Sequence, residues 1–539
     1  MAIQKLLVAN RGEIAVRIFR ACSEAGIATV AVAAPDDVGA FHTRIADETV
    51  EIESYLFSEE HIRAAKSIGA DAIHPGYGFL AENAEFADAV EAAGIVFVGP
   101  TPDGLRRGGD KLQAKRIAHE AGVPVLPAGA PGEVGFPIVV KAAAGGGGRG
   151  MRVVRDPAQL DEATDAARRE AKAAFGDDTV YYERFVERPR HVEIQLLADE
   201  HGEVVALGER DCSIQRRHQK VLEESPSPAL DRELRARMSE AAVAFGRAIG
   251  YRSAGTVEFM LDGRNFYLLE LNGRIQVEHP VTELVSGVDI VREQLRIAAG
   301  EPLDLEPRFE GHAVEARLYA EDPKSFLPQA GRIERLRLPT GVRVDAGVEE
   351  GDEVGVAYDP MIAKLIAHGP TRGEALLRLR DALAETRVEG LTTNLPFLRW
   401  LVAHPVVRAG RATTAFLAEY PPLSAPPARL PSGPWDAAWR LNLPAPEPQA
   451  PPDVDELTHA RAGAGGGEQS TLTAPMPGTV IKVLAAPGDK VEHRQTLLVL
   501  EAMKMETPIA SPYDGTVRAV HVSEGDQVAG GTLLVELED

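Results

Sequence analysis

Cysteine, positive charge and long apolar runs are all scarce in this sequence, and each shortage removes a class of protein from consideration. The two cysteines, Cys22 and Cys212, cannot build a disulfide framework, and no Cys/His cluster has the spacing of a zinc site. A reducing, cytoplasmic location fits that usage. The first apolar run ends at Asn10, Arg11 and Glu13, too early for a signal peptide, and no later run reaches membrane-spanning length. We therefore expect no membrane partner.

Lysine and arginine number 58 against 81 aspartates and glutamates, so the formal net charge is -23 at pH 7. A surface of that sign repels phosphates, and nucleic acid is not an expected partner. What is present is a mixture typical of soluble globular proteins, with 44% hydrophobic and 26% charged residues. A chain of 539 residues is too long for one core, and its length predicts about three to four domains.

Residues 3 to 110 alternate short apolar runs with amphipathic stretches. The runs "KLLVAN", "IATVAVAA", "DAIHP" and "GIVFVGP" predict a parallel sheet with helices on both faces. The turn after the first run is "ANRGEIA" and not GxGxxG, which disfavours a dinucleotide site. Residues 74 to 83, "HPGYGFLAEN", form a glycine-broken strand end of the kind at which such folds bind ligands, although a plain tight turn has the same spacing.

Proline, alanine and glycine dominate residues 421 to 469, which indicates a linker. Inside it, Trp435 and Trp439 have helical spacing, and the sequence leaves open whether this patch docks on a neighbouring surface. An internal repeat follows, in which "PMPGTVIKVLAAPGDKV…TLLVLE" from Pro475 matches "PYDGTVRAVHVSEGDQV…TLLVELE" from Pro512. Two strand-rich copies, each too small to close a core alone, predict a flattened sandwich with pseudo-twofold symmetry.

The segment that joins the two copies, "EAMKMETPIAS", places Lys504 at a predicted hairpin tip. Most lysines in turns are simply solvated. Here a methionine stands on each side of the lysine, and apolar side chains at an exposed turn lower solubility unless something recognises them. The context therefore favours a modification site.

Residues 270 to 280, "ELNGRIQVEHP", alternate polar and apolar side chains, which predicts a strand with one polar face. A turn at residues 261 to 266 would place Glu258 and Glu270 on neighbouring strands, where their like charges repel. A hard cation removes that repulsion, and Asn272 adds a third oxygen ligand, so the pattern points to magnesium. A solvated face paired with arginines is the alternative, but Arg274 is the one arginine in this stretch.

Two further stretches suit anions. Residues 136 to 155, "FPIVVKAAAGGGGRGMRVVR", predict strand, loop and strand, and the bare amides of the loop can close on phosphate oxygens beside Lys141. The loop lacks the Gly-Lys-Ser/Thr of a P-loop, and a glycine run alone is usually just flexible chain. The run "QRRHQK" concentrates nitrogen-bearing side chains in an acidic protein, which favours a local anion site over a merely cationic surface.

The Ala-Met-Lys-Met turn at residues 502 to 505 resembles that of the biotin carboxyl carrier domain, whereas lipoyl domains of the same fold usually carry Asp-Lys-Ala. Residues 1 to about 420 resemble the biotin carboxylases of the ATP-grasp superfamily. They contain, in family order, "GDK" at 109 to 111, "KAAAGGGGRGM", "RHVEIQ" at 190 to 195, "ERDCSIQRRHQKVLEE" at 209 to 224, "NGRIQVEHPVTE" and "YDPMIAKL" at 358 to 365. Such agreement is more specific than any single motif. The chain is thus similar to the α subunit of a biotin-dependent acyl-CoA carboxylase.

The resemblance implies an α/β and α+β multidomain fold. Its expected parts are a Rossmann-like N-terminal domain at residues 1 to 110, an ATP-grasp domain at 111 to 305, a mixed C-terminal carboxylase domain at 306 to 420, the linker at 421 to 469, and an all-β biotinyl domain at 470 to 539.

The resemblance also implies cofactors and a site: biotin covalently bound to Lys504, and ATP with Mg²⁺ or Mn²⁺. The implied ATP-binding residues are Lys111, Lys141, Gly145, Gly146, Gly147, Gly148, Gly150, Glu183, Val186, His191, Gln215 and His218. The implied metal ligands are Glu258, Glu270 and Asn272, and the implied bicarbonate-binding residues are Lys220, Arg274, Gln276 and Val277. The implied catalytic residues are Lys220, Arg274, Glu278 and Arg343.

These assignments are chemically consistent. Arg274 can clamp a flat anion through paired hydrogen bonds, and Glu278 can accept the bicarbonate proton as general base. Deprotonated bicarbonate attacks the γ-phosphate, whose charge the metal and lysines spread, and the resulting carboxyphosphate releases carbon dioxide for biotin. Arg343 matches the family arginine that stabilises the biotin enolate.

The sequence departs from the family pattern in a few places. Gly273 stands where relatives usually have Thr, Ser, Ala or Pro, and we expect a looser backbone with altered metal or bicarbonate affinity. The segments "AGVPVLPAGAPGEVGFP" and the one after "ADETVEIESYL" are short. The linker has no room for the folded domain with which some α subunits grip their β subunit, and the sequence has no carboxyltransferase domain.

The expected partners are a separate carboxyltransferase β subunit, a biotin protein ligase and bicarbonate, with a homodimer through the carboxylase domain or a larger α/β complex. The expected acceptor is acetyl-CoA or propionyl-CoA, which would place the protein in fatty acid biosynthesis or propionyl-CoA metabolism. Two alternatives stay open: an oxoacid or urea acceptor, and a carrier scaffold whose ATP site has decayed. Intact Lys141, Glu258, Glu270, Arg274, Glu278 and Arg343 speak against decay.

Overall fold

The computed structural model describes residues 3–142, 151–175, 178–216, 219–355, 357–425, 471–474, 478–492, 495–502, 505–528 and 532–538. The predicted polyglycine loop, Trp435, Trp439 and Lys504 lie outside these residues. Among the described helices, none combines the length and the apolar character that crossing a bilayer requires.

The N-terminal part contains the predicted parallel sheet, with the strand order β3-β2-β1-β4-β5. Its strands are β1 (Lys5–Val8), β2 (Ala28–Ala33), β3 (Glu48–Glu51), β4 (Ala72–His74) and β5 (Val96–Phe97). The connecting helices are α1 (Gly12–Glu24), the 3-10 turn η1 (Pro35–Asp37), α2 (Phe41–Ile45), α3 (Ser58–Ile68), α4 (Ala84–Ala92) and α5 (Pro102–Gly109). Leu6 of β1 packs in one core with Ile18 of α1, and the next residue, Leu7, packs in another with Phe86 of α4, because successive strand residues face opposite sides.

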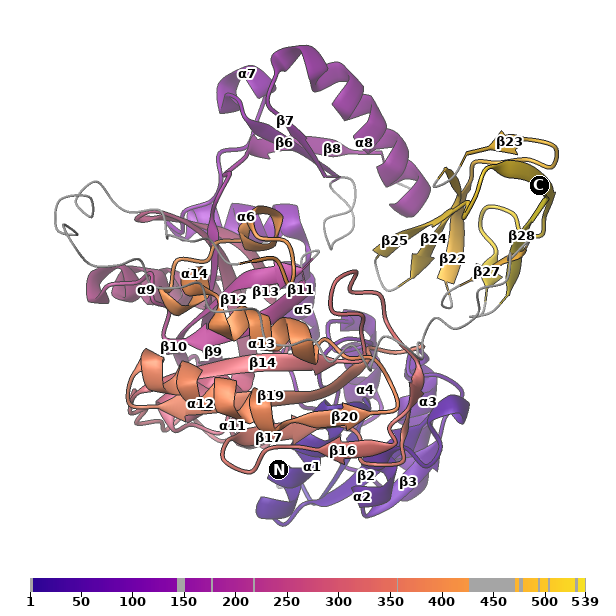
Figure 1. The fold of residues 1–539 in the computed structure, drawn as a ribbon. Coiled ribbons are helices and arrows are strands. Elements are labelled where there is room, and N and C mark those ends of the chain that lie inside the picture. Colours follow the sequence, from indigo (N-terminus) through magenta and orange to yellow (C-terminus); the bar gives the residue numbers. More distant parts are fainter. Residues whose placement is uncertain are drawn as a thin grey trace, which may run out of the picture.

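An eight-stranded sheet, of order β13-β12-β9-β10-β11-β14-β19-β17, runs through the middle of the molecule (Figure 1). Its strands are β9 (Arg190–Ala198), β10 (Val204–Arg216), β11 (Gln219–Ser225), β12 (Ser253–Asp262), β13 (Asn265–Asn272), β14 (His312–Tyr319), β17 (Arg343–Ala346) and β19 (Met361–Gly369). Since β11 pairs with β14, the sheet continues from the predicted ATP-grasp part into the predicted C-terminal carboxylase part.

Helices cover the two ends of this sheet with separate cores. Phe245 of α9 packs with Phe259 of β12, whereas Leu379 of α12 and Phe397 of α13 pack with Leu365 of β19. The helices of this region are α6 (Lys111–Glu120), α9 (Arg232–Ile249), α10 (His279–Ser286), α11 (Ile290–Ala298), α12 (Arg372–Glu385), α13 (Leu395–Ala403), α14 (Pro405–Arg408) and α15 (Phe416–Glu419). Two small ribbons pair β15 (Gly331–Arg332) with β18 (Glu353–Val354) and β16 (Arg335–Arg337) with β20 (Arg387–Glu389).

A separate three-stranded sheet, β7-β6-β8, stands apart from the large sheet (Figure 1). It consists of β6 (Ile138–Ala142), β7 (Arg152–Val154) and β8 (Val180–Arg184), with α7 (Pro131–Val134), the turn η2 (Pro157–Gln159) and α8 (Leu160–Phe175) beside it. β6 and β7 pair antiparallel, so the predicted strand, loop and strand around the glycine run is confirmed, although the loop itself lies outside the described residues.

The C-terminal repeat forms two four-stranded sheets, β21-β28-β26-β23 and β25-β24-β22-β27, as the predicted sandwich requires. The strands are β21 (Thr471–Thr473), β22 (Gly478–Val483), β23 (Lys490–Val491), β24 (Thr496–Ala502), β25 (Met505–Ala510), β26 (Gly515–Val520), β27 (Gln527–Val528) and β28 (Leu533–Glu538). Both sheets mix the copies: β23 of the first copy pairs with β26 of the second, and β27 of the second pairs with β22 of the first.

One strand prediction was wrong. β13 ends at Asn272, and residues 273–278 are irregular chain that leads into α10, so residues 270–280 are not one strand. Polar and apolar side chains of this loop are buried alike, as Ile275, Gln276 and Glu278 show, so the alternation does not separate an exposed face from a buried one. The part of the prediction that concerns the carboxylates is confirmed, since Glu258 and Glu270 are direct cross-strand partners.

The side chain of Asn10 holds the turn after β4, together with His74, whose Nδ1 accepts from the backbone N of Gly76 at 3.0 Å. Asn10 donates from Nδ2 to the carbonyls of Pro75, at 2.8 Å, and Tyr77, at 2.7 Å. Between them, Gly76 has a φ of +63°, and a Cβ there would lie 2.8 Å from Asn10 Nδ2.

We expect Gly76→Ala to destabilise the protein more than Gly94→Ala. Both glycines have positive φ, which costs a residue with a Cβ about 1–2 kcal/mol, but a Cβ at Gly94 meets nothing within 4 Å. Urea denaturation measures the two losses of unfolding free energy. Equal losses would show that the Asn10 contact contributes nothing to the turn.

Candidate active site

Lys220, on β11, lies at the centre of a buried polar cluster. Its Nζ donates to Glu193 of β9 at 2.5 Å, Glu258 of β12 at 2.8 Å, and Gln276 and Glu278 of the loop after β13 at 2.9 and 2.6 Å. The three carboxylates are almost fully buried. These five residues are called the Lys220 cluster below.

The strand register explains why these residues meet. Glu193 and Glu258 are cross-strand partners, and so are Glu193 and Arg210 of β10, which places their side chains on one face of the sheet. Arg210 is fully buried and donates to Glu193 at 2.5 Å, and to Gln195, Thr282 and Thr256 at 2.7 to 3.0 Å. The sheet therefore orients the cluster before any ligand binds.

The cations determine the charge state of the cluster. Burial opposes ionisation of Glu258 and Glu278, but Lys220 outweighs it and holds the pKa of both carboxyls well below their usual range. Burial likewise opposes the charge on Lys220, and the surrounding carboxylates raise its pKa well above the ordinary value. We therefore expect these groups to be ionised at neutral pH.

Glu278 has a second cationic partner on the next strand. Arg317 of β14 lies 2.9 Å from Glu278 and 2.6 Å from Glu223. Burial raises the pKa of Glu223 to about 7, with Glu278 adding to the effect and Arg317 opposing it. Two cations thus fix the carboxylate of Glu278 from opposite sides.

The predicted metal ligands are adjacent to this cluster. Burial and the neighbouring Glu258 raise the pKa of Glu270, which indicates repulsion between two carboxylates. Asn272 donates to Glu258 at 2.8 Å, and His191 Nε2 lies 3.0 Å from Glu258 Oε2. Two facing carboxylates and an amide oxygen fit a hard divalent cation, because oxygen ligands suit Mg²⁺ and its charge would remove their repulsion.

Arg274 lies next to the predicted metal ligands. Its Nη2 donates to Asn272 Oδ1 at 2.9 Å, and its Nε lies 3.2 Å from Glu82. Glu82 also accepts from the backbone N of Gly273 at 3.0 Å, and a Cβ at Gly273 would lie 2.9 Å from Leu105. The glycine is therefore closely packed where we expected a looser backbone.

The predicted ATP-binding residues are spread over several elements. Lys141 of β6 donates to Glu183 of β8 at 2.6 Å, and Lys115 of α6 is a second ion-pair partner of Glu183. Gln215 of β10 contacts His191 Nδ1 at 2.9 Å. Lys111 begins α6 and contributes to the electrostatics of Glu270, and Val186 is buried after β8. Lys504, His218 and the loop glycines, Gly145, Gly146, Gly147, Gly148 and Gly150, lie outside the described residues.

Known proteins match this chain domain by domain. Residues 2–105 and 315–419 match the models described as the N-terminal and C-terminal domains of biotin carboxylase. Residues 110–306 match the ATP-binding domain of the carbamoyl-phosphate synthase L chain, and residues 470–537 match the model for biotin-requiring enzymes. The biotin carboxylase of Halalkalibacterium halodurans is 48% identical over 441 residues, which cover 77% of this chain and 98% of that protein.

The chain belongs to the biotin carboxylase family.

Two other relatives and one solved structure extend the comparison. The propionyl-CoA carboxylase alpha chain of Ruegeria pomeroyi is 47% identical over 77% of this chain and 68% of its own. The alpha subunit of mouse mitochondrial methylcrotonoyl-CoA carboxylase is 37% identical over 100% of this chain and 93% of its own. One solved structure is the biotin carboxylase domain of Hydrogenobacter thermophilus 2-oxoglutarate carboxylase, a dimer with magnesium ADP and bicarbonate. It matches this chain with a TM-score of 0.75 and 44% identity, and the match covers 78% of this chain and 98% of that one.

These findings confirm the expected multidomain fold and the expected biotin carboxylase fused to a carrier domain. They also support biotin and ATP with magnesium as the cofactors. Manganese is not tested by them.

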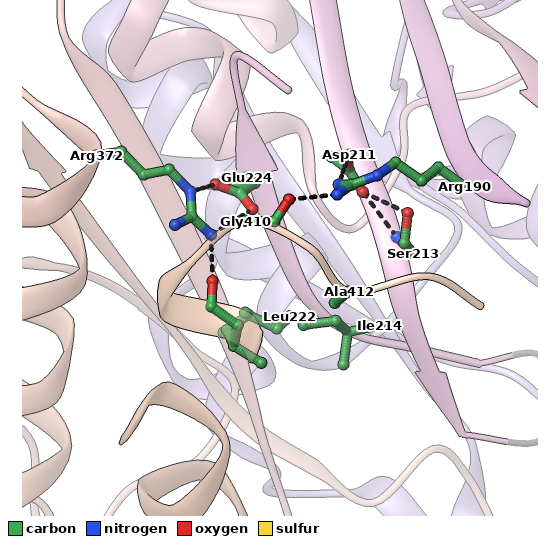
Figure 2. Close-up of a pocket in the computed structure, with 10 residues that line it drawn as sticks. Arg190, Asp211, Ser213, Ile214, Leu222, Glu224, Arg372, Gly410 and Ala412 are labelled. Carbon is green, nitrogen blue, oxygen red and sulfur yellow. Dashed lines mark hydrogen bonds and ion pairs between the residues drawn. The ribbon is translucent and has the colours of Figure 1, made fainter. Parts of the chain in front are cut away.

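The cavities of this biotin carboxylase add little to the site. A cavity of about 10 Å³ lies between β10, β11 and residues 407–412. Arg190 pairs with Asp211 there at 3.0 Å, and Arg372 pairs with Glu224 at 2.6 Å (Figure 2). That volume is near the minimum for one water molecule. Its lining includes no member of the Lys220 cluster. A larger cavity, of about 470 Å³, is lined partly by Val186 and Phe136.

Arg343 is not brought into the Lys220 cluster. It lies on β17, where its ion-pair partners among the described residues are Glu283 of α10, at 2.7 Å, and Asp345, at 2.9 Å. Burial opposes the charge on Arg343, but these two carboxylates raise its pKa above the usual range.

Several site residues were missed by the sequence reasoning. Arg210 and Arg317 contact members of the cluster, and Glu223 pairs with Arg317. Glu82 holds Arg274, and Lys115 pairs with Glu183. One signal was available: in "HAVEARLY", Glu315 and Arg317 occupy alternate positions of an otherwise apolar strand, which places two charges on one buried face.

We expect Lys220→Met to destabilise the protein in a pH-dependent way. The depressed pKa values of Glu258 and Glu278 mean that Lys220 contributes stability above the unfolded carboxyl pKa, near 4.5, and that this contribution is lost as the pH falls further. Removing the cation should lower the unfolding free energy by about 3–5 kcal/mol at pH 7, and by less at pH 4.

Lys5→Met is the matched control, since Lys5 pairs with Glu48 at 2.7 Å on the surface, and should cost less than about 1 kcal/mol. Urea denaturation at both pH values compares the variants. A loss for Lys220→Met that does not change with pH would contradict the charge balance described above.

Proposed function

We propose that the chain uses ATP and bicarbonate to carboxylate a biotin on its own Lys504, through carboxyphosphate. The supporting observation is that Glu258 faces Glu270 across two strands and also accepts from Lys220, whose Nζ donates as well to Glu278 of the loop after β13. A nucleotide-bound cation and a small anion would thus be held within one connected set of side chains.

The proposed roles follow from the contacts. Glu258, Glu270 and Asn272 would hold Mg²⁺, whose positive charge stabilises the transferring phosphoryl group when it is bound. Arg274, Gln276 and Lys220 would bind bicarbonate, and Glu278 would accept its proton. Lys220 and Arg317 stabilise the ionised form of Glu278 and so make it a weak base. We propose that bound bicarbonate pairs with Lys220 in place of part of the Glu278 contact, which would make Glu278 a stronger base.

The remaining site residues are assigned by position. We propose that Lys111, Lys141, Glu183, Val186, His191, Gln215, His218 and the glycines from Gly145 to Gly150 bind ATP, and that Arg343 binds biotin. The proposed domain limits, at residues 110, 305, 420 and 469, rest on the sequence pattern and lie close to the ends of the family matches. We also propose a homodimer through the carboxylase part, as in the Hydrogenobacter thermophilus relative.

We further propose that this α subunit passes the carboxyl group to a separate carboxyltransferase β subunit that acts on acetyl-CoA or propionyl-CoA. The human propionyl-CoA carboxylase alpha chain, 38% identical over 99% of this chain, is aligned through both the carboxylase and the carrier parts. The mouse alignment spans 669 positions, whereas this chain has 539 residues. The mouse protein therefore has residues with no counterpart in this chain.

An oxoacid acceptor is the second candidate, because the carboxylase part is 44% identical to that of a 2-oxoglutarate carboxylase. That likeness covers 78% of the chain, less than the likeness to the mouse and human acyl-CoA carboxylase alpha chains, at 100% and 99%. Profiling acyl-CoA and oxoacid acceptors with the copurified β subunit separates the two candidates.

Bicarbonate-dependent ATP hydrolysis with free biotin tests the carboxylase reaction. We expect Glu278→Gln to lower kcat by about 10²–10⁴-fold, because the buried base is lost while the shape is kept. Glu48→Gln, on the surface, is the control and should leave the rate unchanged. If the folded wild-type protein shows no turnover, the decayed-scaffold alternative is favoured.

Intact mass after coexpression with a biotin protein ligase tests the carrier. We expect the wild-type chain to gain the mass of one biotinyl group and Lys504→Ala to gain none. Lys504→Ala should still hydrolyse ATP with free biotin, because the reaction site lies on the carboxylase part. A biotinyl group on the variant would place the attachment site elsewhere.

A further inference from the structure

Three sequence motifs without an assigned role meet at one point in the fold. Glu13 comes from "ANRGEIA" at the start of α1, Tyr77 from "HPGYGF" after β4, and Lys364 from "YDPMIAKL" on β19. Tyr77 Oη donates to Glu13 Oε1, and Glu13 Oε2 lies 3.1 Å from Lys364 Nζ. Lys364 Nζ then donates to the main-chain carbonyl of Val277 at 2.8 Å.

The loop that receives this contact has few main-chain partners of its own. Residues 273–278 are irregular, so their carbonyls lack the regular pairing of a strand or helix. The carbonyl of Gln276 accepts from the backbone N and from Nδ1 of His279, and the carbonyl of Val277 accepts from Lys364. The side chains of Gln276 and Glu278, on either side of Val277, both point to Lys220.

Burial makes this contact unlike a surface ion pair. The side chain of Lys364 is 0% exposed and that of Glu13 is 2% exposed. A buried ammonium is stable only where carboxylates and hydrogen-bond acceptors replace water, and here Glu13, the Val277 carbonyl and the more distant Asp345, at 4.0 Å, do so. The position of Lys364 Nζ is therefore fixed from several directions.

A neighbouring cation completes the arrangement. Lys364 and Arg317 are cross-strand partners in the β14–β19 pair, so their side chains share a face. Arg317 contacts the carboxylate of Glu278, and Lys364 contacts the carbonyl of the residue before it. Two adjacent strands thus hold two consecutive residues of the loop, one by its main chain and one by its side chain.

We propose that Lys364 is a positioning residue that holds the 273–278 loop through the Val277 carbonyl, anchored by Glu13 and Tyr77, so that Gln276 and Glu278 face bicarbonate. This proposal deepens the proposed function and rests on it for its effect on turnover. Lys364 itself touches no substrate; it fixes the loop whose side chains do.

The test compares variants that separate the hydrogen bond from the charge. Lys364→Met removes both the donor to Val277 and the partner of Glu13. Glu13→Gln keeps the donor to Val277 and a polar group beside Lys364, but removes the charge that anchors the ammonium. The double variant Glu13→Gln/Lys364→Met removes the donor and leaves no unpaired carboxylate at position 13. Arg235→Met, which breaks the 2.8 Å pair with the buried Glu209, controls for loss of a buried ion pair elsewhere.

Two measurements are made on the full-length protein. Amide hydrogen exchange of the peptide that covers residues 273–279 reports on the loop without turnover. Steady-state ATP hydrolysis with free biotin, at varied bicarbonate and at varied MgATP, gives the kinetic effect. In both Lys364 variants we expect faster exchange and a kcat/KM for bicarbonate that is roughly tenfold to a hundredfold lower, with the KM for MgATP within about twofold. Glu13→Gln weakens the anchor but keeps the donor, so it should lie between the wild type and Lys364→Met in both measurements, and Arg235→Met should resemble the wild type.

The outcomes are distinct. If the double variant recovers wild-type bicarbonate kinetics, the effect of Lys364→Met comes from an unpaired charge, and the positioning role is wrong. Unchanged exchange at residues 273–279 overturns the proposal whatever the kinetics. If exchange rises but the wild-type protein shows no bicarbonate-dependent hydrolysis, the loop contact stands and the proposed function fails.

Discussion

The ion pairs of Lys220 are the interaction on which the site depends. Glu193, Glu258 and Glu278 all contact the ammonium of Lys220. Without that cation the carboxylates would repel one another, because two like unit charges about 4 Å apart repel by about 4 kcal/mol at the effective dielectric of a protein surface. The sheet imposes this proximity through its register, and Lys220 makes it tolerable. Because the same carboxylate of Glu258 faces Glu270, any cation that binds there changes the charge balance at Lys220.

Each part of the carboxylase region contributes to this one loop and its surroundings. The N-terminal part supplies Glu82, which holds Arg274, and the strands after residue 306 supply Arg317, which holds Glu278. The large sheet joins these parts without interruption, since β11 pairs directly with β14. The geometry of the proposed bicarbonate site is therefore a property of the assembled region and not of the ATP-grasp part alone.

The sequence predicted the parts of this arrangement that depend on local pattern. Alternating apolar runs identified the parallel sheet, the turn before Asn265 placed Glu258 opposite Glu270, and the repeat identified the sandwich. It failed where long-range contacts decide: the residues after Asn272 form an irregular loop that buries polar and apolar side chains alike, so periodicity misled. Arg317, Glu82 and Lys115 lie far along the chain from their partners, and no local pattern announces such pairs.

The exchange of strands between the two C-terminal copies has a consequence for how such a domain can arise. Each copy lends its short strand, β23 or β27, and the strand that precedes the copy, β21 or β25, to the sheet built on the other copy. A single copy would therefore carry two surplus strands and two unfilled edges of matching shape. Such a copy could complete both sheets by pairing with a second identical copy. A one-copy ancestor would therefore fold as a symmetric homodimer, and gene duplication would only have to join its two copies in one chain.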